Sequence, residues 1–206
     1  MHCPAVRADL SLQIKTTGPV TLWSIDMIRD DISDADREKA LQLMYEIIRQ
    51  SKGGLQGKAR LFKAFYLANL IHAHNAPVCL CDWPIVKMPN GPGIHEFPAL
   101  IAELVDRGWV EQRDIQIGPY PSTEFRVVRE DVATTFSETE KESIRGAVEY
   151  VRSKTASELS DETHEFSRTW QESDIGAALD VYVDLIRETE FQKREQAIEE
   201  LKKIFR

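Results

Sequence analysis

Apolar side chains recur at helical spacing along three stretches in the first half of the chain, residues 33–54, 57–75 and 95–107. The first stretch opens with the capping residues Ser33 and Asp34 and ends in two glycines, which is the asymmetry expected of a helix. The second stretch leaves little polar surface in its later half, so the pattern predicts a central, buried helix there.

The letters NGPG precede the third stretch and raise the question of a phosphate-binding loop, because backbone N–H groups at a helix start attract anions. Neither of the two glycine motifs typical of nucleotide phosphates is present, and Pro92 removes one backbone donor. We interpret Gly91, Pro92 and Gly93 as a constrained approach to a helix that begins at about His95.

Extended segments are predicted at two places. Residues 9–25 alternate apolar and polar positions around a Thr-Gly-Pro break, which predicts two short strands. Residues 109–129 contain two extended runs around Gly-Pro-Tyr-Pro-Ser, which predicts a β-hairpin. The expected fold is mainly α with α+β character: a compact helical domain with a hairpin after its fourth helical segment, winged-helix-like in part, plus short N-terminal strands.

Further helices are predicted after the hairpin. Ser137 and Glu140 stand in capping-box relation, and SELSDETHEFSRTW predicts a short helix capped by Ser157 or Ser160. The domain organisation that we expect is an N-terminal extended segment at 1–32, a helical domain at 33–171, and a C-terminal extension at 172–206 with helices near 175–187 and 191–205.

The bulk properties of the 206 residues narrow the class of protein. No apolar run approaches the length of a membrane span, and the N-terminus lacks the apolar stretch of a secretory signal, so we expect a cytoplasmic protein with no membrane partner. Three cysteines, two of them one residue apart, favour reduced thiols over a disulfide framework. A net charge of −8 disfavours non-specific binding to DNA.

Charge is nevertheless distributed unevenly along the chain. Residues 47–81 contain no acidic side chain, whereas residues 157–190 are strongly acidic. Cations in the first turns of a helix oppose its dipole, so we expect an intramolecular acidic face or solvent to compensate them, with an acidic partner or a nucleic-acid backbone as the alternative. The candidate nucleic-acid-binding residues are Lys52, Lys58, Arg60 and Lys63.

Metal and catalytic chemistry receive weak support from the residue spacing. His72, His74, Cys79 and Cys81 are zinc-ligand types, but residues two apart on a helix point in nearly opposite directions, so we favour a structural role for all four. The adjacent pairs His95–Glu96 and His164–Glu165 diverge on a helix and do not make a ready dyad. We therefore expect no enzyme, no cofactor, no metal and no small-molecule substrate.

Three motifs, in order along residues 38–171, resemble the Panacea family of SocA-like antitoxin domains from bacterial and phage toxin–antitoxin systems. GKARLFKAFYLANLIH is similar to the family's Lys-Leu-x-Lys-Leu-Leu-Tyr-Phe helix, with Arg60 to Leu67 in its place. CDWPIVKMPNGPGIHEFPALIAEL resembles the segment around the family's Tyr-Gly-Pro turn, where Asn90-Gly91-Pro92 stand. The segment ASELSDETHEFSRTW is similar to the family's Leu-Ser-x-x-x-His-x-x-x-x-Trp signature through Leu159, Ser160, His164 and Trp170, with one more residue between the histidine and the tryptophan.

The resemblance implies a protein-binding module that neutralises a cognate toxin by direct contact, the toxin usually being encoded by an adjacent gene. Operator DNA is a second candidate partner, and a winged-helix DNA-binding transcriptional regulator is the alternative function. By analogy with the family, the contact surface is expected around Tyr66, Asn90, Gly91, Pro92, His95 and His164.

Overall fold

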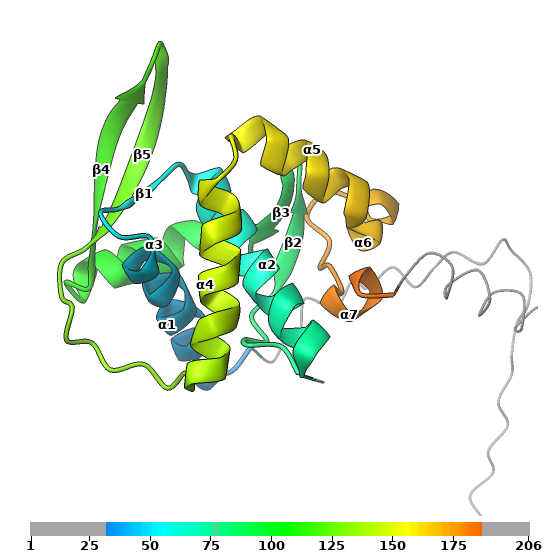
Figure 1. Cartoon of the computed structure of the whole chain (residues 1–206), viewed down its shortest axis with the longest axis horizontal. Coiled ribbons are helices and arrows are strands. Elements are labelled where there is room, and N and C mark those ends of the chain that lie inside the picture. The colour runs from blue at the N-terminus through cyan, green and yellow to red at the C-terminus, as the bar shows by residue number, and fades with distance from the viewer. Residues whose placement is uncertain (1–31, 77, 187–206) are drawn as a thin grey trace, which may run out of the picture.

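A computed structural model describes residues 32–76 and 78–186, which form an α+β fold with two small antiparallel sheets (Figure 1). The helices are α1 (Asp34–Gln50), α2 (Lys58–Asn75), α3 (Phe97–Asp106), α4 (Glu138–Arg152), α5 (Ala156–Phe166), α6 (Arg168–Glu172) and α7 (Val181–Asp184). The strands are β1 (Leu55–Gln56), β2 (Ile85–Met88), β3 (Gly91–Ile94), β4 (Val110–Ile117) and β5 (Tyr120–Val127).

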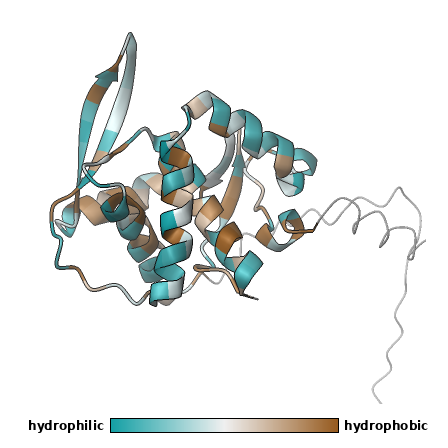
Figure 2. Ribbon diagram, in the orientation of Figure 1, coloured by the Kyte–Doolittle hydropathy of each residue, from teal (hydrophilic) through white to brown (hydrophobic). Residues whose placement is uncertain are grey.

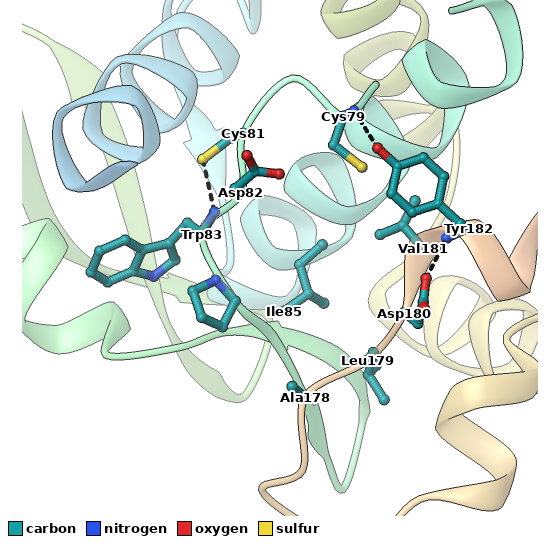
Figure 3. Close-up of a pocket in the computed structure, with 11 residues that line it drawn as sticks. Cys79, Cys81, Asp82, Trp83, Ile85, Ala178, Leu179, Asp180, Val181 and Tyr182 are labelled. Carbon is teal, nitrogen blue, oxygen red and sulfur yellow. Dashed lines mark hydrogen bonds between the residues drawn. The ribbon is translucent and has the colours of Figure 1, made fainter. Parts of the chain in front are cut away.

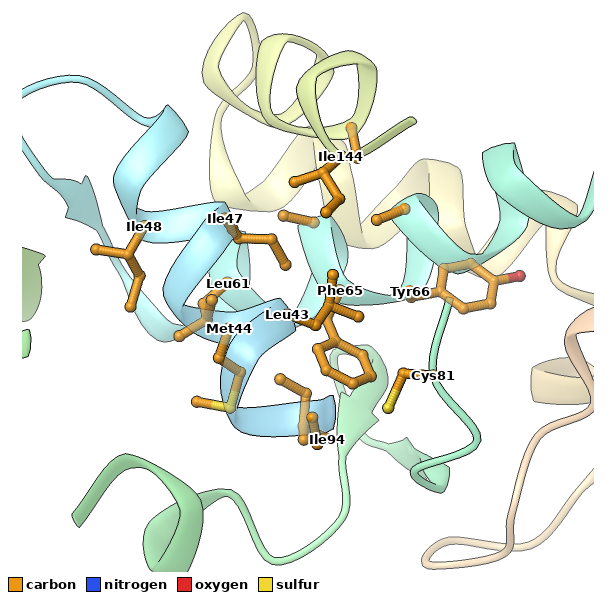
Figure 4. Packing of buried hydrophobic residues seen from close by; sticks show 14 of the residues in the cluster. Leu43, Met44, Ile47, Ile48, Leu61, Phe65, Tyr66, Cys81, Ile94 and Ile144 are labelled. Carbon is orange, nitrogen blue, oxygen red and sulfur yellow. The ribbon is translucent and has the colours of Figure 1, made fainter. Parts of the chain in front are cut away.

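Helix α2 lies at the centre of the fold, between α1 and α4, as its apolar sequence predicts. Leu61 and Phe65 are fully buried there: Leu61 lies beside Met44 of α1, and the Phe65 ring points toward Ile94 of β3 (Figure 4). Helix α4 is hydrophobic on one side only, which is visible as alternating colours in Figure 2, because its other side meets solvent.

Local capping chemistry starts the helices largely where the sequence predicts. Ser33 caps α1, and the Ser137–Glu140 capping box of α4 is confirmed, with both reciprocal hydrogen bonds present. The prediction for α5 was wrong by a few residues, because Thr155 is its cap and forms a capping box with Glu158. A threonine with an acidic residue three positions later satisfies two backbone donors, which neither predicted serine does.

The predicted hairpin at 109–129 is confirmed as β4 and β5, joined by a two-residue turn and paired from Val110 opposite Val127 to Ile117 opposite Tyr120. Strand β1 adds to β5, so the sheet order is β1-β5-β4. Three helices of the described chain precede the hairpin, and not four. The outer half of the hairpin projects beyond the helices (Figure 1).

The NGPG segment differs from its interpretation as the approach to a helix. Gly91 to Ile94 form strand β3, which pairs with β2, and α3 begins only at Phe97. The prolines explain the difference: Pro92 sits on the second strand of a two-stranded hairpin, where one missing N–H is tolerated, and Pro98 occupies the first turn of α3.

The chain beyond α6 runs along the outer edge of β2 and is not the helix predicted at 175–187. Lys87 N donates to Ala177 O at 2.8 Å, and Leu179 N donates to Ile85 O at 2.7 Å. The edge of β2 thus bonds to backbone groups that would otherwise bond within a helix, and within residues 173–186 only Val181–Asp184 is helical. The strands predicted at 9–25 and the helix predicted at 191–205 lie outside the described residues.

Among the described helices, none has the length and apolarity of a membrane span.

Candidate functional site

Three segments that are distant in sequence meet around the ammonium group of Lys63 on α2. Lys63 Nζ donates to the backbone carbonyl oxygens of Asn90 at 2.5 Å and Pro92 at 3.2 Å. The residue is 1% exposed, and burial lowers the pKa of its amine to about 7. The β2–β3 turn is therefore held on α2 by a lysine that has no carboxylate partner among the described residues.

Gly91 makes this close approach feasible. Its φ of 99° lies in the region that favours glycine, and an added Cβ would collide with Lys63 Nζ and lie 2.7 Å from Thr163 Oγ1 of α5. The lysine amine, the turn backbone and the α5 hydroxyl are thus packed around a position with no room for a side chain.

Tyr66, one turn after Lys63, is fully buried and fastens the chain that follows α6. Its hydroxyl donates to Asp184 Oδ2 at 2.6 Å, and burial followed by the Asp184 charge raises the pKa of the Tyr66 phenol. Ser167 Oγ and the backbone N–H of Thr169 also donate to this carboxylate, each at 2.9 Å. Asp184 is therefore a hub that ties α7 to α2 and to the start of α6.

His164 of α5 stacks on Trp170 of α6, with ring centroids 3.7 Å apart. The ammonium of Lys87 lies 4.5 Å from the Trp170 ring centroid, and Trp170 Nε1 donates to Met88 O at 2.9 Å, so this stack also rests on β2. Burial, with the Lys63 charge as the next cause, lowers the pKa of His164. His164 Nε2 is buried and has no hydrogen-bond partner among the described residues.

The β2–β3 turn and α5, which meet at the Lys63 cluster, also carry exposed side chains, and we call these residues the turn–α5 surface. It consists of Asn90 at the tip of the β2–β3 turn and Asp161, Glu165 and Phe166 on α5. Phe166 is 37% exposed and stacks on the buried Tyr66 ring at a centroid distance of 6.1 Å. These residues thus supply two exposed carboxylates and a partly exposed aromatic ring.

Five of the six residues predicted for partner contact come together in or beside this cluster, namely Tyr66, Asn90, Gly91, Pro92 and His164. His95 does not join it. Its backbone oxygen accepts a hydrogen bond from Trp83 Nε1, and its ring lies 4.0 Å from the Glu96 carboxylate. The buried Tyr66, Gly91 and Pro92 support the surface from below, whereas Asn90 is exposed.

The four basic residues predicted for nucleic-acid contact do not form one surface. Lys52 and Lys58 are exposed, whereas Lys63 is buried. Arg60 donates to the carbonyl oxygen of Lys154 at 2.9 Å and to that of Val151 at 3.3 Å. We expected an acidic face or solvent to compensate these cations, but Arg60 and Lys63 donate to backbone carbonyl oxygens.

The His/Cys set predicted to be structural is spread over the fold. His72 is buried against Ser143 Oγ at 3.3 Å, whereas His74 is exposed. Burial raises the pKa of both thiols, that of Cys81 to about 12, which disfavours the thiolate that a metal needs. Among the described residues, no group of three or more ligand-type side chains could hold a metal ion.

A hollow of about 360 Å³ lies between residues 79–85 and the segment that follows α6 (Figure 3). Trp83, Ile85 and Val181 give it apolar walls, and the Tyr182 hydroxyl at its rim accepts from Cys79 N at 3.0 Å. Its presence depends on the docking of the post-α6 segment, which the Asp184 hub holds in place.

Sequence reasoning missed three residues of the cluster: Thr163, Lys87 and Asp184. Lys87 lies inside the second motif and Thr163 inside the third, but neither was among the predicted site residues. Asp184 is one of ten acidic residues in residues 157–190 that share no distinguishing local pattern.

No family model, no curated protein and no solved structure matches this chain.

Proposed function

We propose that this protein is an antitoxin-type binding module that neutralises a cognate toxin by direct contact. The observation that carries the proposal is the meeting of the three motifs on which the Panacea resemblance rests. Lys63 and Tyr66 come from the first motif, Asn90 to Pro92 from the second, and His164 from the third. These motifs are dozens of residues apart in the sequence, yet their residues lie in or beside one cluster, so the motifs form one structural unit.

The turn–α5 surface is the contact face in this proposal. It carries an exposed aromatic ring, Phe166, which stacks on the buried Tyr66 ring, and two acidic side chains. Aromatic residues on a preorganised support are typical of energetically important interface positions. The acidic side chains Asp161 and Glu165 favour a partner that presents lysine or arginine there.

The proposal is tested by growth rescue in bacteria. Each gene adjacent to the one for this protein is expressed alone and then with this protein, and we expect one neighbour to be toxic alone and harmless in combination. Asn90→Arg is expected to abolish rescue, because it places a cation on the acidic contact face. Glu149→Arg, which places an arginine at another exposed position, on α4, is the control that keeps rescue.

The proposal fails if none of the adjacent genes is toxic and rescued. If rescue occurs but survives both Asn90→Arg and a second surface change, Phe166→Glu, then the antitoxin function stands and the contact face is elsewhere.

A winged-helix DNA-binding regulator is the second candidate, favoured by one observation. The order α1-β1-α2-α3-β4-β5, with sheet order β1-β5-β4 and the β2–β3 hairpin inserted before α3, resembles the winged-helix arrangement. The helix that would enter the major groove, α3, contains no lysine or arginine, which weakens this candidate. Duplex binding that weakens steeply with salt would support it, and no binding at low salt would eliminate it.

A further inference from the structure

Strand β4 leaves one long edge open. It is the outer strand of the sheet, and no described residue pairs with the side that faces away from β5. The projecting half of the hairpin carries apolar side chains at its tip, where Ile117 is 42% and Tyr120 is 72% exposed. A long unpaired edge with apolar ends is a template for another strand.

The free backbone groups on this edge follow from the pairing with β5. Val128 N donates to Trp109 O at 2.9 Å, and hydrogen-bonded pairs alternate along an antiparallel ladder. The odd-numbered residues of β4 therefore bond to β5. Pro121 stands opposite the even-numbered Gln116. Because proline has no N–H, this pair cannot exchange two backbone hydrogen bonds, which agrees with the assignment. The amide and carbonyl groups of Val110, Gln112, Asp114 and Gln116 consequently point outward.

The side chains along this edge are self-complementary in one register. Two identical antiparallel strands related by a two-fold axis pair residues of the same face. When the axis passes beside Gln112, Glu111 of each copy lies opposite Arg113 of the other copy, which gives two complementary pairs. Centring it on Glu111, Arg113 or Asp114 sets like charges directly opposite, which is destabilising.

We propose that β4 is a self-association edge, through which two copies of this chain pair antiparallel about Gln112 to make one continuous sheet. The two Gln112 residues exchange both backbone hydrogen bonds, and Ile115 lies opposite the half-buried Trp109 of the second copy. The projecting tip of each hairpin lies beside the base of the other strand. Because an edge of this length buries less than a standard interface, we expect a dimer of about micromolar or weaker affinity.

The ionic groups are available for this exchange. Within one chain, Arg113 and Glu111 pair at 2.7 Å, and the Arg113 side chain is 54% exposed. An exposed pair of this kind contributes little to the stability of the monomer. Both groups can therefore turn to their counterparts across the edge without a large loss.

Sedimentation velocity on the full chain, over concentrations up to about 1 mM, tests the proposal. We expect a reversible monomer–dimer equilibrium. Arg113→Glu and Glu111→Arg should each weaken it about tenfold or more, because each sets like charges opposite. The double variant Glu111→Arg/Arg113→Glu should restore it, since the charges are complementary again. Arg152→Glu, at an exposed position on α4, is the control and should leave the equilibrium unchanged.

Amide hydrogen exchange supplies an independent reading that does not depend on any variant. The amides of Gln112 and Asp114 should gain protection as the wild-type concentration rises, while that of Tyr120 at the hairpin turn should not change. A wild type that stays monomeric throughout, a dimer that both single reversals leave intact, or a double variant as weak as the singles would each overturn the proposal.

Discussion

The ammonium nitrogen of Lys63 lies 2.5 Å from the carbonyl oxygen of Asn90, and this contact holds the turn of one hairpin on the central helix. A buried cation is costly unless polar groups surround it, and here carbonyl oxygens take that role. The contact explains why Lys63 is buried although Lys58 of the same helix is exposed, and Gly91 and Thr163 pack against the same ammonium group.

Gly91→Ala is expected to destabilise the protein by about 2 kcal/mol or more, because a strained φ is combined with a collision. The matched control is Gly53→Ala. Gly53 has a similar φ of 94°, but an added Cβ there meets nothing within 4 Å. Urea unfolding of both variants separates the two effects, since strain alone would make their losses equal.

Lys63→Met is expected to change how stability depends on pH. The amine has a pKa of about 7 in the fold against 10.5 ordinarily, so between these values the unfolded chain binds more protons than the fold. Stability from this group therefore rises with pH across that window, by at most about 1.4 kcal/mol per pH unit.

The measurement is the free energy of unfolding of wild type minus that of Lys63→Met at a series of pH values from 6 upward. The difference should grow in favour of the wild type as pH rises through about 7. Lys58→Met, at an exposed position on the same helix, is the control for the loss of a lysine from α2. A flat profile for Lys63→Met would contradict the burial of its charge.

Tyr66→Phe is expected to destabilise the fold by about 1.5–3 kcal/mol, because it removes a buried hydrogen bond to a carboxylate. The loss should appear as faster amide exchange in residues 174–186, which the Asp184 hub holds. Tyr182→Phe is the control: its hydroxyl accepts a bond from Cys79 N, but the residue is 45% exposed, so its effect should be smaller.

His164 is expected to titrate below the ordinary histidine pKa of 6.5 when its ring protons are followed by NMR. Burial is the main cause and the Lys63 charge is the next. Lys63→Met should therefore raise the pKa of His164 towards its ordinary value without restoring it. A pKa of His164 that does not move in this variant would show that the two groups are not electrostatically coupled.

The elements near the middle of the chain were accessible to prediction because their signals are local. The capping boxes, the apolar stripe of α2 and the hairpin at 109–129 depend on residues within one turn or one strand pair. The strand that includes Gly91, Pro92 and Gly93 could not be predicted from such local signals. Glycine and proline there are equally compatible with a helix approach and with a second strand, and the pairing partner β2 decides between them.

The candidate site was recoverable only in part. The motifs named Tyr66, Asn90 and His164, but charge pattern alone placed Lys63 on a nucleic-acid surface. The pairing of an amine with carbonyl oxygens leaves no trace in composition, since every residue has a carbonyl. Asp184 was missed for a related reason, because its donors come from α2 and α6, far away in the sequence.

By itself the sequence determined the central helix, the capped starts of its neighbours and the second hairpin, because short-range periodicity and backbone capping specify them. Tertiary structure alone decided that Lys63 points inward, that Gly91 must lack a side chain, and that the chain after α6 follows β2 as an extended segment. Those outcomes depend on which groups are desolvated together, and desolvation is a property of the assembled fold.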